Sequence, residues 1–251
     1  ESSAASDVYK RQTMDLPGDE EEDVFERFCQ TLDQEKQYMF FLLNNKENRK
    51  VCLGVDDAVY CAGIVTNDVM SLTEKHPATM VPDRLEFDSL KDMFNYTEND
   101  VDIDESQGVI VFAPNNIHFR VTNKNYLTKF NLRNNVQSIK YRYLELRMDD
   151  AKRLEFQTLY PEWMPTMDLY ENTIFKIAHT IYDVYRAKYV VKNISRVPKM
   201  QENMYRLLCK SQTWHSKSPN KNIVNVNYII NSINKLKPSV VNHMIRSIVL
   251  P

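Results

Sequence analysis

The sequence has few glycines and cysteines and no long apolar run. Four of its 251 residues are glycine and four are cysteine. It has no stretch of about 18 apolar residues, which excludes an encoded membrane-spanning helix. The cysteines are not paired at the short spacings of a zinc site or a disulfide framework. We therefore expect reduced thiols, no disulfide and a cytoplasmic protein without a membrane partner.

The composition and the first residues indicate the origin of the sequence. Asn, Lys, Ile and Tyr are plentiful and Gly and Ala are scarce, a bias typical of AT-rich genomes such as those of large viruses, phages and protists. For a viral protein, the cytoplasm would be that of an infected host cell. Residues 2–12 (SSAASDVYKRQ) match, in one reading frame, a tagmentation adapter for sequencing libraries. We therefore treat residues 1–12 as an adapter-derived scar and expect native sequence from about Thr13.

Charge is distributed unevenly along the chain. From Lys124 onward there are 21 of the 32 Lys and Arg residues but only 9 of the 34 Asp and Glu residues. That part carries a formal charge of +12 and the preceding part −14. A basic half is what a polyanionic partner such as RNA requires, because phosphate contacts release counterions. Simple compensation between the two halves is the other interpretation.

Hydrophobic periodicity predicts an α+β protein in which a strand-rich part precedes a helical part. Strands are expected at 38–43, 49–55, 58–66, 108–113 and 117–122, with turns at Asp56-Asp57 and 114–116. Helices are expected at 24–34, 84–95, 136–148, 149–159, 167–192, 223–236 and 240–248, and another after Pro198. We assign residues 13–130 to the first domain and 131–251 to a helical C-terminal domain.

The second predicted hairpin combines two kinds of face. Ile117, Phe119 and Val121 alternate with His118, Arg120 and Thr122, and the period of a strand places each set on its own face. Lys124 would join the polar set if the strand continued. This polar face is either a phosphate-binding surface or the solvent side of a half-buried strand.

Four short motifs carry a resemblance to a known family. They are YMFFL (38–42) with NRKV (48–51), CAGIVT (61–66), QGVIV (107–111), and RVT (120–122) with Tyr126 behind it. In order and interval, the run from Tyr38 to Leu132 resembles the nucleotidyltransferase domain of the single-strand RNA ligases of T-even phage type.

The resemblance implies an antiparallel-sheet nucleotidyltransferase core, present here in part, that binds ATP and Mg²⁺. In this family a lysine attacks the α-phosphate of ATP, AMP passes to an RNA 5′-phosphate, and the 3′-hydroxyl of a second end displaces it. The implied partner is RNA, including tRNA-like stems. The nucleotide-binding positions that the motifs assign are Phe41, Gln107, Gly108, Arg120, Thr122 and Lys124.

The chain departs from the family pattern at these same positions. Phe41 and Gln107 stand where the family has glutamate, and Arg120 and Thr122 stand where it has lysine. Arginine keeps the charge without the geometry of lysine. No Lys-x-Asp/Asn-Gly nucleophile motif occurs between Thr13 and Tyr38, so we assign no catalytic residue and expect the lysine further upstream. The alternatives are a catalytically inactive, ligase-like RNA-binding protein and an unrelated helical interaction protein.

Basic and aromatic residues of the helical part are candidate RNA contacts. The positions are Arg133, Lys140, Arg142, Arg147, Trp214 and His215. Ion pairs with Glu145 or Asp149 would explain part of the basic band, and Trp214 would serve equally well as a packing anchor. His179 lies beside an apolar stripe and is expected in the core. We assign no metal site, because Cys209 and His215 lack two further ligands and the acidic loop 97–106 lacks EF-hand spacing.

Overall fold

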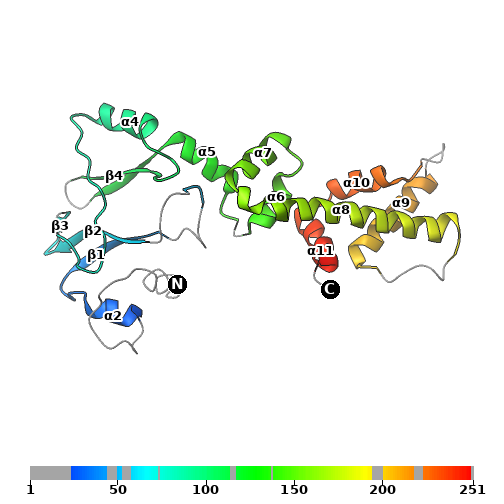
Figure 1. The fold of residues 1–251 in the computed structure, drawn as a ribbon, viewed down its shortest axis with the longest axis horizontal. Helices are drawn as coiled ribbons and strands as arrows, with labels where there is room; N and C mark the ends of the chain where they lie inside the picture. The colour runs from blue at the N-terminus through cyan, green and yellow to red at the C-terminus, as the bar shows by residue number, and fades with distance from the viewer. Residues whose placement is uncertain are drawn as a thin grey trace. The chain divides into compact units, whose positions relative to one another are not determined.

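The computed structural model describes residues 24–43, 50–52, 58–72, 74–113, 117–136, 138–193, 200–217 and 223–249. The chain divides into two compact units, Glu1–Asn131 and Leu132–Pro251, called unit 1 and unit 2 below. Unit 1 contains the strands and unit 2 is helical in its described parts, which confirms the mixed α+β class (Figure 1). Within the described residues, no helix combines the length and apolar character needed to cross a bilayer. None of the four cysteines forms a disulfide.

Unit 1 contains a three-stranded antiparallel sheet with β2 in the centre. β1 (Gln37–Leu43) and β3 (Val69–Ser71) flank β2 (Ala58–Thr66). The predicted strands at 38–43 and 58–66 are confirmed. The strand predicted at 49–55 is wrong for residues 50–52, which form no strand, because β1 pairs directly with β2. The turn predicted at Asp56-Asp57 lies outside the described residues.

A tight turn that the alternation did not predict joins β2 to β3. Asn67 and Asp68 have φ angles of 50° and 62°. Two successive positive φ angles are typical of a type I′ hairpin turn, which Asn and Asp accommodate better than most residues. The central strand is buried on both sides, with Val59, Cys61 and Ile64 inaccessible to solvent.

The helices of unit 1 differ in length and start from the predicted ones, and α4 begins at a polar capping residue. α2 (Val24–Gln30) is shorter than predicted, and α4 (Leu90–Asn99) starts later than the predicted Arg84. Ser89 caps α4, since its hydroxyl accepts from the Asp92 amide at 3.2 Å and donates to the Asp92 carboxylate at 2.6 Å. This reciprocal pair satisfies an amide that the helix start leaves unpaired. The predicted acidic loop therefore begins only after Asn99.

The second hairpin forms as predicted. β4 (Gly108–Phe112) pairs antiparallel with β5 (His118–Thr122), and α5 (Lys124–Arg133) follows almost immediately. The turn at 114–116 lies outside the described residues.

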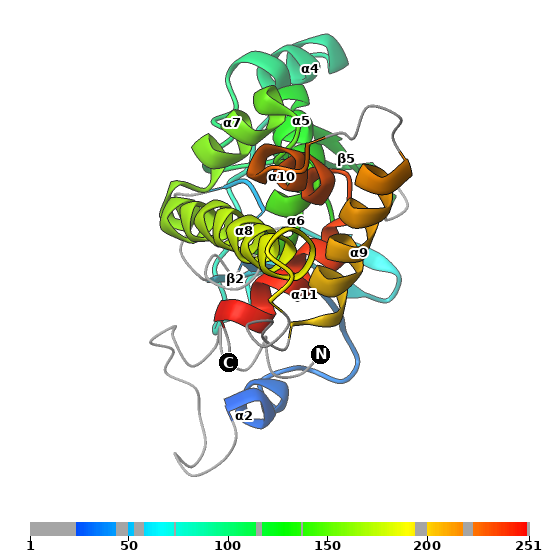
Figure 2. The same cartoon turned by 90° about the vertical axis from the view of Figure 1, so that its right-hand side faces the viewer.

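In unit 2, helices pack around α8 (Met164–Tyr185). α6 (Ile139–Leu146) and α7 (Asp150–Leu159) precede a short 3-10 turn, Pro161–Trp163, and a π-helical turn, Arg186–Val190, extends α8. α9 (Glu202–Lys217), α10 (Val226–Asn234) and α11 (Pro238–Val249) contact α8 (Figure 2). The predicted stripe of Ile174, Ile177 and Ile181 is buried. The core position predicted for His179 is wrong, since its side chain is exposed beside the Phe175 ring.

A buried histidine joins α2, β1 and the loop after β3. His76 lies among the rings of Phe28, Tyr38 and Phe40, with centroids 5.3–6.0 Å away. Its Nδ1 accepts from the Ala78 amide at 3.3 Å, so Nε2 carries the proton and donates to Thr31 Oγ1 at 3.0 Å. Burial lowers the pKa of His76 below its usual 6.5. The neutral imidazole is therefore the form that the fold accommodates.

We expect unit 1 to lose stability as the pH falls below about 6.5, the pKa of an unfolded histidine. Between that value and the lower folded pKa, the unfolded chain binds the proton that the folded chain excludes, so stability rises with pH by at most about 1.4 kcal/mol per unit. Hydrogen exchange of β1 and β2 amides at pH 5 to 7.5 measures this, because both tryptophans, Trp163 and Trp214, lie in unit 2. His76→Gln should flatten the profile after correction for intrinsic exchange; equal slopes would contradict the assignment.

Candidate functional site

The base of the β4–β5 hairpin brings together five of the six positions that the motifs assign to a nucleotide. Gly108 is paired with Thr122 in the ladder. Arg120 Nη1 donates to Gln107 Oε1 at 3.0 Å, and the Asn123 amide donates to the Gln107 carbonyl at 3.0 Å. Lys124 follows at the start of α5. Four of the five therefore come from two paired chain segments, and the fifth comes from the adjoining helix.

Gly108 is required by the hairpin itself. Its φ is +141°, and a Cβ built there would lie 2.1 Å from the Val121 carbonyl oxygen. No side chain fits at that distance, so the close approach of the two strands depends on glycine. The glycine of the motif consequently has a structural explanation that is independent of any ligand.

The two faces of the hairpin differ less than the alternation predicts. In an antiparallel ladder, paired residues share a face, so Arg120 lies beside Ile110 and His118 beside Phe112. On the other face, Phe119 pairs with Val111 and is 44% exposed. The alternation predicted along β5 is therefore kept, but the cross-strand partners of β4 bring apolar residues to the Arg120 face.

Asn123 links the hairpin to both helices beside it. Its side-chain Nδ2 donates to the carbonyls of Thr97 and Glu98 at the end of α4, at 2.8 and 3.2 Å. Its Oδ1 accepts from the amides of Asn125 and Tyr126 at the start of α5, at 2.8 and 3.1 Å. Asn123 is almost fully buried, and its bonds to the Thr97 carbonyl and from the Tyr126 amide are buried with it. This side chain determines where β5 ends and α5 begins.

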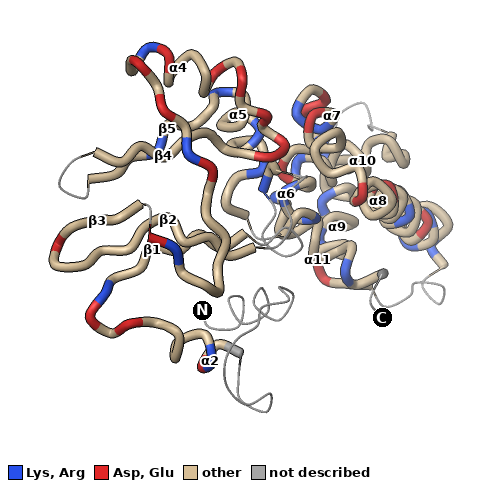
Figure 3. Tube along the Cα trace, turned by 60° about the vertical axis from the view of Figure 1, so that its left-hand side comes forward, with Lys and Arg blue, Asp and Glu red and all other residues tan. Residues whose placement is uncertain are grey.

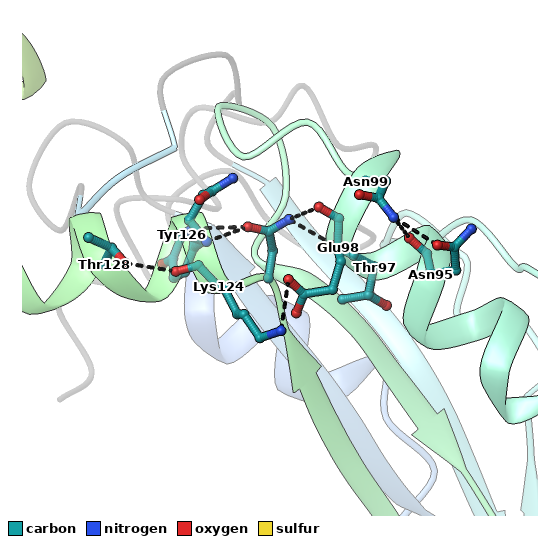
Figure 4. A network of polar contacts seen from close by, with 9 residues as sticks. Asn95, Thr97, Glu98, Asn99, Lys124, Tyr126 and Thr128 are labelled. Carbon is teal, nitrogen blue, oxygen red and sulfur yellow. Dashed lines mark hydrogen bonds and ion pairs between the residues drawn. The ribbon is translucent and has the colours of Figure 1, made fainter.

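The early start of α5 changes the position of Lys124. The strand does not continue to residue 124, so the predicted alignment of Lys124 with Arg120 and Thr122 is wrong. Lys124 Nζ instead lies 3.6 Å from Glu98 Oε2, in a largely exposed pair (Figure 4). Tyr126, the tyrosine behind the last motif, is buried, and its burial together with the nearby Cys52 raises its pKa to about 12 against the opposing charge of Arg120.

Phe41 lies apart from the hairpin cluster. It belongs to β1, opposite Tyr60, in the other sheet of unit 1. The part of the chain that the structure describes gives no contact between Phe41 and Arg120. The arrangement at the hairpin base is therefore built around one exposed guanidinium, which suits an anionic ligand because its N–H groups form a planar fork.

The donor set at the hairpin base does not suit a metal ion. Gln107 is neutral, and its amide oxygen already accepts from Arg120. In the described ranges no group of three His, Cys, Asp or Glu side chains is placed to hold a metal. Mg²⁺ that accompanied ATP would keep its water and phosphate ligands.

Two arginines of the predicted RNA-binding band lie inside unit 2. Arg133 is 4% exposed, donates to the Val136 carbonyl and lies 5.9 Å from the centroid of the Tyr160 ring. Arg147 has a side chain 8% exposed and binds both carboxylate oxygens of Glu171 at 2.7 Å, as well as Asn234 Oδ1 at 2.8 Å. Predicting RNA contacts at these two positions is therefore wrong, because the guanidinium groups connect helices of the core.

The other two members of the band, Arg142 and Lys140, differ in how accessible their charges are to a ligand. Arg142 donates to the Leu132 carbonyl at 2.9 Å and to Glu145 at 2.7 Å, so the ion pair considered from the sequence is confirmed. Lys140 is exposed, with its ammonium 5.7 Å from the Trp163 ring centroid. Within the predicted band, Lys140 is thus the residue whose charge is most accessible.

Trp214 and His215 lie on different sides of α9. The indole stacks on the Tyr228 ring of α10, with centroids 3.9 Å apart and planes at 17°. Trp214 remains 36% exposed, whereas His215 is half-buried one residue further around the helix. Trp214 is therefore both a packing anchor and an accessible aromatic surface.

Sequence reasoning missed the residues that position these groups. Asn directly before a helical segment is a capping signal, so Asn123 was detectable in principle. No local pattern indicates the partners of Glu171, which accepts from Arg147 and from the Tyr143 hydroxyl at 3.0 Å. Burial alone would raise the pKa of Glu171, but these donors lower it below its usual value.

Comparisons with known proteins give one distant viral relative. The chain is 29% identical over 146 residues to a protein of Invertebrate iridescent virus 3 named "Immediate-early protein ICP-46 homolog". The match covers 56% of this chain and 32% of that protein, so the chain spans about a third of the relative's length. No family model and no solved structure matches.

Replacing Asn123 should lower the free energy of unfolding of unit 1. Asn123→Ala removes the cap of α5 and two donors to α4, which we expect to destabilise unit 1 by about 2–3 kcal/mol. Asn123→Asp keeps the cap oxygen but not the donors, and should also destabilise. Hydrogen exchange of residues 90–133 measures the effect. Asn99→Ala, which removes only exposed bonds to Asn95, is the matched control. Unchanged exchange in Asn123→Ala would contradict the proposed link.

Replacing Arg147 should destabilise unit 2. Arg147→Met leaves Glu171 without its fork, and because that carboxylate is 39% exposed, we expect a loss of about 2 kcal/mol rather than the larger loss of a fully buried pair. Arg147→Lys should recover little, since an ammonium lacks the fork. Arg153→Met, which breaks an exposed pair with Asp150, should change stability by less than about 1 kcal/mol. Urea unfolding followed by tryptophan fluorescence compares the three.

The same pair gives unit 2 a dependence on acid pH. Because the folded pKa of Glu171 is lowered, its contribution is complete above its unfolded pKa of about 4.5 and is lost as the pH falls through the folded value. Glu171→Gln should lack this loss. A wild-type profile identical to that of Glu171→Gln below pH 4.5 would show that the pair does not titrate as described.

Proposed function

We propose that this chain carries part of an ATP-dependent, RNA-ligase-like nucleotidyltransferase of viral origin, in which the β4–β5 hairpin binds ATP phosphates through Arg120. The joining of RNA 5′-phosphate and 3′-hydroxyl ends through a lysyl-AMP intermediate is the activity proposed for the whole protein. A partial antiparallel nucleotidyltransferase core is the fold proposed for unit 1.

One observation carries the proposal. Gln107 and Gly108 come from one motif and Arg120 and Thr122 from another, and the hairpin brings these two motifs together in one ladder, where Arg120 donates to Gln107. Arg120 is exposed, and among the described residues Gln107 is its hydrogen-bond partner. A guanidinium held by one neutral side chain keeps its charge and further N–H donors for a phosphate. The iridovirus relative supports a viral origin.

A second candidate function is nucleotide binding without turnover. Gln107 and Phe41 lack the carboxylates of the family pattern, and each lost transition-state contact typically lowers a rate by about 10²-fold or more. The two arginines buried in unit 2 also reduce the number of cations left for RNA. Covalent labelling of the whole protein by radioactive ATP distinguishes the candidates, because only the first forms a lysyl-AMP intermediate. No Lys-x-Asp/Asn-Gly motif occurs between Thr13 and Tyr38, so we expect this chain to bind ATP without being labelled.

ATP affinity should depend on Arg120. Arg120→Gln removes the cation but retains a polar side chain, and we expect the dissociation constant for ATP to rise about tenfold or more, as for a lost charge-assisted hydrogen bond. Isothermal titration calorimetry on the full chain measures it. Arg84→Gln, at an exposed position in the loop before α4, is the matched control. Undetectable ATP binding by the wild type, or equal affinity in both variants, would refute the proposal.

A further inference from the structure

The C-terminal part of unit 2 is almost free of acidic residues. From Val184 to Pro251 the sequence has twelve Lys and Arg residues and one acidic residue, Glu202. Glu202 is therefore the one side chain of this segment that balances positive charge, and it pairs with Arg206 one turn along α9. The described Lys and Arg residues of this segment are drawn in blue in Figure 3. Such a charge distribution attracts a polyanion.

One face of α9 arranges cations around the exposed indole. Arg206, Lys210, Trp214 and Lys217 recur at spacings of three and four residues, which places them on one side of a helix. All four are exposed, whereas Met204, Leu207, Leu208 and Ser211 face the core. Lys210 and Lys217 lie two turns apart, about 10 Å along the axis, with Trp214 between them. We call these four residues the α9 stripe.

The indole in the stripe has a fixed orientation. Tyr228 of α10 stacks on it at 3.9 Å, so Trp214 does not need to be ordered when a ligand binds. An accessible aromatic surface between two ammonium groups matches a nucleobase between two backbone phosphates. The base faces of a duplex are already stacked on one another, so only a single strand offers this pattern.

We propose that the α9 stripe binds single-stranded RNA, with a base stacked on Trp214 and phosphates beside Lys210 and Lys217. The choice of RNA over DNA rests on the proposed function, whereas the single-stranded polynucleotide is argued from unit 2 alone. In this proposal the RNA-binding surface of unit 2 is the α9 stripe, instead of the band that includes the inner arginines Arg133 and Arg147.

Fluorescence anisotropy on the full chain with a labelled oligouridine of about 12 nucleotides tests the proposal at several salt concentrations. Lys210→Gln combined with Lys217→Gln should weaken binding about tenfold and reduce the slope of log K against log salt by about 1.4, since each phosphate contact on a single strand contributes about 0.7. Trp214→Leu should weaken binding about tenfold with an unchanged slope. Lys152→Gln combined with Lys176→Gln removes the same charge from α7 and α8 and should bind as the wild type does.

Four results would overturn the proposal. They are no binding of the oligonucleotide by the wild type, equal affinities of the Lys210/Lys217 variant and its control, duplex RNA binding as tightly as the single strand, and tighter binding to phosphatidylserine vesicles. If Trp214→Leu fails to fold, the paired lysine variants still decide the outcome. Arg120→Gln should leave RNA affinity unchanged, and the lysine variants should leave ATP affinity unchanged, so failure at one site is distinguishable from failure at the other.

Discussion

The buried side-chain amide of Asn123 fixes the positions of the elements of unit 1 around the candidate site. The Asn123 side chain donates to a carbonyl at the end of α4 and accepts from an amide at the start of α5. Its backbone N–H donates to the carbonyl of Gln107, the residue before β4. These contacts end β5 at Thr122, turn Lys124 toward Glu98 and leave Arg120 as the exposed cation of the hairpin. The geometry proposed to hold a nucleotide thus depends on a residue that does not face the nucleotide.

Unit 2 uses its positive charge in two different ways. The side chains of Arg147 and Arg133 are buried, and they donate to Glu171 and to the Val136 carbonyl. The lysines of α9 are exposed and have no such internal role among the contacts that the structure describes. Arginine suits the first use because its rigid fork satisfies several acceptors at once, and lysine suits the second because it is a flexible point charge. The formal charge of +12 counted from Lys124 onward therefore overstates the positive charge that a ligand can reach.

Local patterns predicted most helices and strands, but long-range contacts determined which side chains are buried and which remain accessible. The strands at 38–43 and 58–66 and the stripe of Ile174, Ile177 and Ile181 followed from periodicity, which burial imposes directly. The predicted start of α4 at Arg84 was wrong because the Ser89 cap outweighs the helical spacing of the earlier apolar residues. The role of Arg147 was inaccessible because its partners, Glu171 and Asn234, are 24 and 87 residues away in sequence. Sequence spacing identified the hairpin positions but not the contacts of Asn123 that arrange them.

The most direct test of the central claim is hydrogen exchange across the whole chain with and without ATP. The account predicts slower exchange on ATP binding in residues 107–110 and 119–126, where the hairpin base meets α5, and no change in α8 or α10. ATP-dependent protection confined to unit 2, or none at the hairpin at ATP concentrations that saturate binding, would contradict the assignment of the nucleotide to this site.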